Sequence, residues 1–216
     1  MVTKSRKPAR ARLAVPHRQT TGASHTIRII GGQWKRTPIT VIDAQGLRPT
    51  PERVRETLFN WLTHLFDGGF ATLSCLDMFA GSGALGFEAA SRGFQHVVMM
   101  EKNRMALRNL QTLREKLKAD QIDILSGDAL LMTKAMADAG RRFDLTCLDP
   151  PFQEHLLPQV LPVSLNLLSD NGLIYIESDV RVTDELLGEC GIADRLSLVR
   201  EGSAGQVYYH LLEKRV

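Results

Sequence analysis

The stretch Leu73-Ser74-Cys75-Leu76-Asp77-Met78-Phe79-Ala80-Gly81-Ser82-Gly83-Ala84-Leu85-Gly86 decides the fold. Its first seven residues form an apolar run of strand length, and the small residues 80–86 then break that run. Residues 87–90 continue with a helical pattern. Glycines allow a backbone to approach a ligand closely, and the first turn of a helix presents free N–H groups. A strand, a glycine turn and a helix in this order predict a nucleotide-type binding site.

The glycine turn fits the pattern G-x-G-x-x-G through Gly81, Gly83 and Gly86. Glu101 follows the next apolar run, where an acid would accept hydrogen bonds from ribose hydroxyls. This pattern alone does not separate a nicotinamide cofactor from another adenosine ligand. Asp77 lies just before the turn, and its carboxylate would repel a pyrophosphate but attract an ammonium or a sulfonium.

A second apolar strand, residues 143–148, ends in Asp149-Pro150-Pro151-Phe152. Here the chain resembles class I S-adenosylmethionine-dependent methyltransferases that modify exocyclic amino groups. Prolines lack N–H groups and have a fixed φ, so this is a stiff turn whose carbonyls point at a ligand. Asp149 and the Pro150 carbonyl can accept hydrogen bonds from a base amine, and Phe152 can stack on the base. Such acceptors would align a poor nucleophile and stabilise the charge that develops on its nitrogen.

Further motifs make the resemblance more specific. In order, they are Arg28-Ile29-Ile30-Gly31-Gly32, Leu47-Arg48-Pro49-Thr50, Arg53-Val54-Arg55-Glu56-Thr57-Leu58-Phe59-Asn60, Asp77-Met78-Phe79-Ala80-Gly81-Ser82-Gly83 and Asp149-Pro150-Pro151-Phe152. From about residue 26 to its end, the chain looks like the bacterial guanine-N2 methyltransferases of 16S ribosomal RNA. That resemblance implies S-adenosylmethionine as cofactor and a guanine of 16S rRNA in the small ribosomal subunit, or in an assembly intermediate, as substrate.

The same resemblance assigns the site residues. It implies catalytic roles for Asp149, Pro150, Pro151 and Phe152, and cofactor contacts for Asp77, Phe79, Gly81, Gly83, Glu101, Lys102, Asp128, Ala129, Arg48 and Thr50. Asp128 would bind the adenine amino group and the Ala129 N–H the ring. Simpler interpretations stay open: Asp128 can cap the helix that follows, Thr50 is a good helix N-cap before Pro51, and Arg48 can be a surface arginine.

Strands and helices alternate along the rest of the chain, which predicts an α/β fold. After the glycine turn the pattern predicts helices at 84–92, 103–119, 129–139, 158–168 and 184–190, and strands at 96–101, 122–125, 143–148, 172–178, 195–200 and 206–212. The final two strands flank an expected turn at 201–205. The resemblance implies a Rossmann-like, seven-stranded, mostly parallel sheet with helices on both faces and an antiparallel last strand. Ligands in such sheets bind at the carboxyl ends of the strands, where Asp77, Glu101, Asp128 and Asp149 are expected.

The N-terminal region differs in composition from the rest. Residues 1–42 hold nine Lys or Arg and no acid, whereas the other 18 basic and 24 acidic residues give a net charge of −6. We expect a disordered basic tail at 1–24, an N-terminal hairpin extension at 25–50 and the methyltransferase domain at 51–216. The tail could contact nucleic acid, act only as a solubilising segment, or serve as a transit peptide.

The expected hairpin pairs residues 26–30 with 39–42 across a turn that contains Trp34. With Lys35 and Arg36, this tryptophan could clamp RNA by stacking and phosphate contact. The alternative is that Trp34 attaches the hairpin to the core. In the next helix, Val54, Leu58, Trp61, Leu62 and Leu65 form an apolar face that we expect in the core.

Composition narrows the function classes. Three cysteines without a C-x-x-C motif predict neither a disulfide framework nor a zinc site, and a reducing cytoplasm fits this usage. We expect a monomer without a metal. No apolar run reaches spanning length and no signal peptide is evident, so we also expect no membrane segment. His96, His155 and His210 lack metal-ligand spacing; His155 could touch substrate or lie on a solvated helix surface.

Four alternative functions remain at this stage. An adenine-N6 methyltransferase on DNA or RNA, or a protein glutamine N-methyltransferase, would use the same turn at Asp149. An NAD-dependent oxidoreductase would use the glycine turn alone and leave that second turn without a role. An RNA-binding module without catalysis would make the acids at the strand ends incidental.

Overall fold

The computed structural model describes residues 25–41, 50–152 and 155–215. Within them the strands are β1 His25–Arg28, β2 Pro38–Val41, β3 Ser74–Asp77, β4 His96–Glu101, β5 Ile122–Ser126, β6 Phe143–Leu148, β7 Leu168–Ser178, β8 Leu196–Ala204 and β9 Val207–Lys214. The helices are α1 Glu52–Leu65, α2 Ala84–Ser91, α3 Arg104–Leu117, α4 Ala129–Asp138, α5 Leu157–Leu165 and α6 Asp184–Glu189. None of the described helices is long and apolar enough to cross a membrane.

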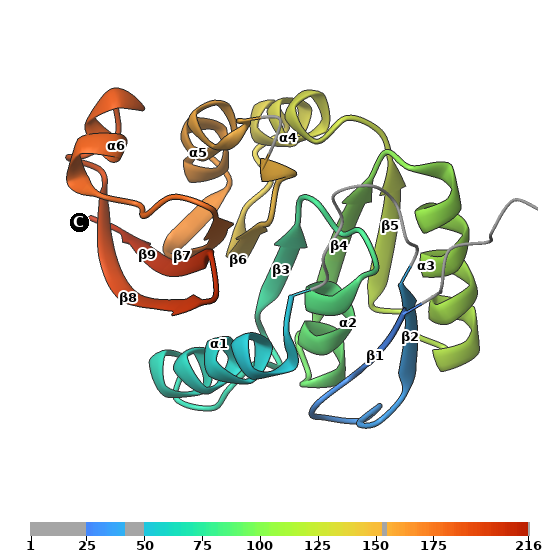
Figure 1. Ribbon diagram of the computed structural model, residues 1–216. Helices are drawn as coiled ribbons and strands as arrows, with labels where there is room; N and C mark the ends of the chain where they lie inside the picture. The colour runs from blue at the N-terminus through green and yellow to red at the C-terminus, as the bar shows by residue number, and fades with distance from the viewer. Residues whose placement is uncertain (1–24, 42–49, 153–154, 216) are drawn as a thin grey trace, which may run out of the picture.

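Seven strands form the central sheet in the order β5-β4-β3-β6-β7-β9-β8. The five strands from β5 to β7 are parallel, and β9 is antiparallel to both β7 and β8. Helices α1, α2 and α3 cover one face of this sheet, and α4, α5 and α6 cover the other (Figure 1). The expected α/β, Rossmann-like fold with an antiparallel last strand is confirmed.

Side chains of each strand alternate between two apolar cores, as a period of two requires. On the α1, α2 and α3 face, Cys75, Cys147 and Tyr175 pack with residues of those helices. On the opposite face, Leu76 and Ile176 pack with residues of α5 and α6. Both faces of the central strands are therefore buried, which is why these strands read as continuous apolar runs.

The two-stranded β1–β2 hairpin confirms the predicted N-terminal hairpin, and it packs on α2 rather than joining the main sheet. Trp34 is only 9% exposed and belongs to the core cluster of that face. Its main-chain N–H donates a hydrogen bond to Ser91 Oγ over 2.9 Å. The tryptophan therefore attaches the hairpin to the core, and the hypothesis that it stacks on RNA is wrong. Lys35 and Arg36 beside it are exposed.

A buried ion pair completes this docking. The Glu88 carboxylate of α2 accepts hydrogen bonds from the N–H groups of Ile30 and Gly31, at 2.7 and 2.8 Å. Arg55 of α1 is fully buried; its Nη1 lies 3.5 Å from Glu88 Oε2 and donates to the Arg28 carbonyl over 2.9 Å. Thus the expected apolar face of α1 contains an unexpected charged residue, which links α1, α2 and the hairpin.

Two predicted boundaries are wrong. The predicted helix 158–168 ends at Leu165, because the Leu167 N–H turns back to the Ser164 carbonyl and the Leu167 carbonyl accepts from Phe143 N–H in the sheet. Strand β7 therefore begins at Leu168. The predicted turn 201–205 is mostly strand, since pairing with β9 continues to Ala204 and only the Gly205 region reverses the chain.

Candidate active site at the carboxyl edge of the sheet

The sheet order brings the four predicted acids to one edge of the molecule. Asp128 follows β5, Glu101 ends β4, Asp77 ends β3 and Asp149 follows β6. Because these strands are parallel neighbours, their carboxyl ends lie side by side. The structure thus places all four acids along the edge where open α/β sheets bind ligands.

The glycine turn has the backbone geometry that motivated its prediction. Gly81 and Gly83 have φ angles of 52° and 81°, which side-chain-bearing residues rarely adopt. A Cβ on Gly83 would also lie 2.6 Å from side-chain atoms of Leu110 and Phe87. Gly83 is the N-cap of α2 and provides no capping side chain, so N–H groups in the first turn are left for another acceptor.

Asp77 lies at the centre of the edge and is 1% exposed. Its Oδ2 accepts a hydrogen bond from the Gly86 N–H over 3.1 Å, whereas the buried Oδ1 has no hydrogen-bond partner among the described residues. Burial raises the pKa of this carboxyl to about 7, because the charged form loses its hydration. A cationic ligand group at Oδ1 would satisfy the orphaned oxygen and restore the ionised form.

Glu101 and Asp128 receive main-chain N–H donors. Glu101 Oε2 accepts from Gly81 N over 2.8 Å, and its Oε1 accepts from Asn103 N over 2.6 Å. Asp128 caps α4 by accepting from Leu131 N over 3.1 Å, so the simpler interpretation of Asp128 is confirmed. Both carboxylates keep further acceptor capacity for a ligand. The exposed Lys102 and the half-buried Ala129 lie directly after β4 and at the start of α4.

Asp149 follows β6 and lies at the same edge of the sheet. Burial, together with the charges of Glu177 and Asp77, raises the pKa of Asp149 well above its ordinary value. Pro150 behind it is buried, while Pro151 and Phe152 are half-buried. Asp149 itself is half-buried, so this turn presents a partly shielded carboxyl group to the edge, with an aromatic ring near its end.

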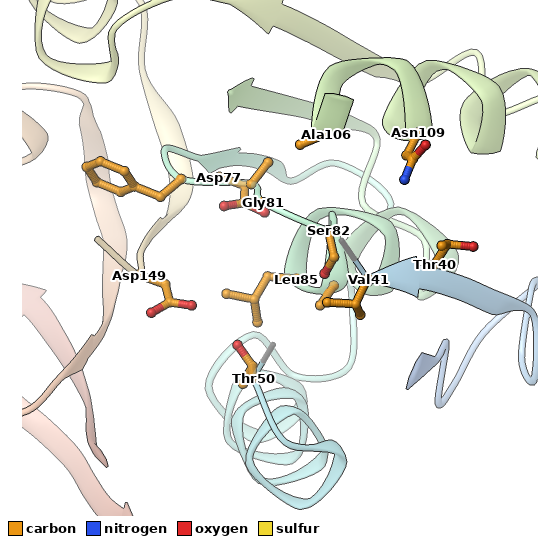
Figure 2. Close-up of a pocket in the computed structure, with 13 residues that line it drawn as sticks. Thr40, Val41, Thr50, Asp77, Gly81, Ser82, Leu85, Ala106, Asn109 and Asp149 are labelled. Carbon is orange, nitrogen blue, oxygen red and sulfur yellow. The ribbon is translucent and has the colours of Figure 1, made fainter. Parts of the chain in front are cut away.

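One pocket joins the glycine turn to Asp149, and it holds about 590 Å³ of empty space, part of it open to solvent. Glu101, Asp128 and Ala129 lie along the same edge but are not among its lining residues. In Figure 2, Asp77, Gly81 and Leu85 face Asp149 and Thr50 across the pocket. Its lining residues are Thr40, Val41, Thr50, Asp77, Phe79, Ala80, Gly81, Ser82, Ala84, Leu85, Ala106, Asn109 and Asp149.

Thr50 lines this pocket as predicted, but it is not the helix cap. Pro51 occupies the cap position of α1, without a side-chain hydrogen bond, and the Thr50 hydroxyl donates to Glu177 Oε1 over 2.7 Å. Arg48 lies outside the described residues. His155 is exposed and lies in a turn before α5 rather than on a helix surface.

Several lining residues were not predicted. Thr40 and Val41 belong to the hairpin, and no local pattern shows that β2 reaches the pocket. Ala106 and Asn109 come from α3 in the same way. Glu177 was also missed, although an acid at the end of an apolar strand was the signal that identified Asp77 and Asp149. Searching every predicted strand end for acids would have found it.

Comparisons with known proteins agree with this geometry. The family described as Conserved hypothetical protein 95 matches residues 27–213. The ribosomal RNA small subunit methyltransferase D of Escherichia coli K12 is 40% identical over 197 residues, which are 88% of this chain and 91% of that protein. The protein of the same name from Haemophilus influenzae is 36% identical, with 90% and 97% covered.

The chain belongs to this family, and the relatives named above are ribosomal RNA methyltransferases. A solved structure from Escherichia coli, named as methyltransferase yhhF, aligns with a TM-score of 0.72 at 38% identity, covering 88% of this chain and 98% of that one. In this chain of the family, the glycine turn and Asp149 line one pocket. The predicted resemblance and cofactor are confirmed, which removes the NAD-dependent alternative.

Proposed function

We propose that this protein transfers the methyl group of S-adenosylmethionine to the exocyclic N2 amino group of a guanine in 16S ribosomal RNA. The observation that carries the proposal is the single pocket that joins the glycine turn to Asp149. The name of the 40% identical relative supports ribosomal RNA of the small subunit as the substrate. Guanine N2 is our assignment, from the motifs that the chain shares with guanine-N2 enzymes.

The part of the edge formed by Asp77, the glycine turn, Glu101 and Asp128, called the cofactor half below, fits S-adenosylmethionine. The unpaired Oδ1 of Asp77 is suited to a cationic group, and the open first turn of α2 offers N–H donors. Glu101 would accept from ribose hydroxyls, and Asp128 with the Ala129 N–H would bind the adenine. Phe79, Gly81, Gly83, Lys102, Arg48 and Thr50 would complete the contacts. The cofactor supplies an electrophilic methyl group on a sulfonium, so the chain itself needs no nucleophile.

The transfer half orients the acceptor. Asp149 and the Pro150 carbonyl would accept hydrogen bonds from the amine and direct its lone pair at the methyl group. Phe152 would stack on the base, which must leave its helical stack to reach the edge of the sheet. Positive charge that develops on the amine nitrogen would be stabilised by the Asp149 carboxylate.

The charge distribution supports an RNA partner. Nine basic residues and no acid lie within residues 1–42, and the body of the chain carries net negative charge. The basic region would contact phosphates near the target and help to offset repulsion between RNA and the acidic edge. We propose that the substrate is 16S rRNA within the small subunit or an assembly intermediate, and that the enzyme acts as a monomer.

The test uses radiolabelled S-adenosylmethionine with three acceptors: small subunits from a strain lacking the modification, free 16S rRNA, and duplex DNA. Labelled nucleic acid is digested to nucleosides. We expect label only as N2-methylguanosine, and the better RNA acceptor defines the assembly stage. Label on adenine or on DNA would replace the proposal by the adenine-N6 function. No label on any acceptor, despite cofactor binding, would indicate a protein or small-molecule acceptor.

A further inference from the structure

Three acids at adjacent strand ends face the same side of the sheet. Strand pairing aligns Asp77 with Cys147 and Leu148 with Ile176. Cys75, Cys147 and Tyr175 all point to the face covered by α1 and α2. Since alternate residues of a strand share a face, the acids two positions further along, at 77, 149 and 177, point there too. Glu177 therefore lies beside Asp149, on the neighbouring strand and on the pocket side.

Glu177 is held rigidly although it lies at a strand end. It is 3% exposed, and its Oε1 accepts hydrogen bonds from the Thr50 hydroxyl over 2.7 Å and from the Tyr175 hydroxyl over 3.0 Å. The Thr50 carbonyl in turn accepts from Arg55 Nε over 3.2 Å. A buried carboxylate with these partners has one orientation, which is the condition for it to position a neighbouring group.

We propose that Glu177 is a positioning residue of the methyl-transfer site, which anchors Thr50 in the pocket wall and places a second carboxylate beside Asp149. This inference rests on the proposed function. Glu177 acts through Thr50 and Asp149, both of which line the pocket. It would not itself touch the reacting atoms.

The second carboxylate matters for the proton that methyl transfer releases. When the bond from nitrogen to the methyl carbon forms, the bond from sulfur to that carbon breaks and the sulfonium becomes a neutral thioether. The amine then carries one proton too many, and this proton passes to the Asp149 carboxylate. A negative charge at Glu177 makes Asp149 a better acceptor for it.

The electrostatics agree with this role. The pKa of Asp149 is raised chiefly by burial, then by the charges of Glu177 and Asp77. Burial raises the pKa of Glu177 as well, while hydrogen bonds from Thr50 and Tyr175 and the charge of Arg55 lower it. Among the described residues, the charged and titratable groups that face Glu177 from β3, β6, β7 and α1 are these and Cys147. Burial outweighs these partners, so the pKa of Glu177 is raised overall, and its ionised form raises the pKa of Asp149.

The experiment compares Glu177→Gln with wild type and with Glu189→Gln, a control that removes an exposed carboxylate at the end of α6. One readout is kcat and KM on the RNA acceptor across pH. The other is the titration of Asp149 by NMR of ¹³C-carboxyl-labelled aspartate in the protein without RNA, assigned with Asp149→Asn. The NMR readout does not depend on the proposed substrate.

For E177Q we expect kcat to fall by about ten- to a hundredfold with little change in KM, as for a misplaced reacting group. We also expect the Asp149 titration, and the acidic limb of kcat against pH, to move to lower pH, because a negative neighbour has been removed. E189Q should behave as wild type. Thr50→Val should lower kcat without a comparable shift of the titration, since the charge of Glu177 remains.

An unchanged kcat together with an unchanged Asp149 titration in E177Q would overturn the inference. A lower kcat with an unchanged titration would also overturn it and leave Glu177 a purely structural role. If E177Q does not fold, Thr50→Val and Tyr175→Phe decide, and a wild-type kcat in both would count against it. If wild type methylates no RNA, the proposed function fails, whereas the NMR titration still tests the contact between Glu177 and Asp149.

Discussion

The two halves of the carboxyl edge are built in different ways. In the cofactor half, around β4 and β5, the carboxylates of Glu101 and Asp128 accept hydrogen bonds from N–H groups within their own or a neighbouring turn. In the transfer half, around β6 and β7, the buried Glu177 accepts from a hydroxyl 127 residues away, and the half-buried Asp149 lies beside it. The cofactor half is thus set mainly by local backbone geometry, and the transfer half by long-range packing.

This difference between the two halves fits the different groups that their carboxylates would bind. Carboxylates that accept from main-chain donors keep further acceptor capacity, which suits the neutral hydroxyl and amine groups of a nucleoside. Desolvation instead raises the proton affinity of a carboxyl group, which suits a site where a proton must be accepted. Asp77 lies between the two halves and combines them: one oxygen has a main-chain donor, and the other is buried without a partner in the part of the chain that the structure describes.

The largest expected effect is in the transfer half. Asp149→Ala should reduce kcat by about a thousandfold or more, because the amine loses both its orientation and its charge stabilisation. Binding of RNA and of S-adenosylmethionine should stay within a few-fold of wild type. Single-turnover methylation and separate binding titrations would measure this. Activity near the wild-type rate would show that the turn at Asp149 is not the acceptor site.

A second prediction concerns the packing that assembles the transfer half. Arg55→Met leaves buried Glu88 without one of its two cationic partners and leaves the Arg28 and Thr50 carbonyls without a donor. Breaking such a buried pair costs about 3–5 kcal/mol of unfolding free energy. The matched control is Arg53→Met, an exposed residue of the same helix. Denaturant unfolding would measure both, and equal stability of the two variants would contradict the prediction.

The same contrast decided what could be predicted from the sequence. The glycine turn and the cap at Asp128 depend on residues close in sequence, and both were predicted at their places. Glu101 was predicted from its position at a strand end, and it accepts from Gly81, 20 residues before it. Thr50 looked like a helix cap because a threonine before Pro51 normally is one. Its hydroxyl donates to Glu177 instead, and no sequence pattern connects residues so far apart. Trp34 left two interpretations open for the same reason.

A third prediction concerns Asp77, which lies between the two halves and has a raised pKa. Its pKa of about 7 in the folded chain lies above its ordinary value of 3.8, so the folded state binds this proton more tightly than the unfolded state. Stability from this group is therefore present at low pH and lost as the pH rises from about 4 to 7. Asp77→Asn removes this loss.

Without cofactor, Asp77→Asn should gain stability over wild type as the pH rises, by about 2 kcal/mol between pH 5 and pH 8. The variant should also bind S-adenosylmethionine more weakly, because the charge that would face its cationic groups is gone. Urea unfolding at both pH values measures the first effect and calorimetric titration the second. A stability difference independent of pH would show that Asp77 is not the titrating group.

The smallest expected effect lies in the cofactor half. Asp128→Ala removes the cap of α4, which costs about 1 kcal/mol of stability, and also removes the proposed acceptor for the adenine amino group. Asp128→Asn keeps an oxygen that can cap the helix, so it separates the two roles. We expect both variants to raise the Kd for S-adenosylmethionine and only the alanine variant to lose stability. Because the contact lies far from the reacting atoms, kcat at saturating cofactor should stay near wild type in both. A fall in kcat as large as that of the Asp149 variant would mean that the two halves do not act separately.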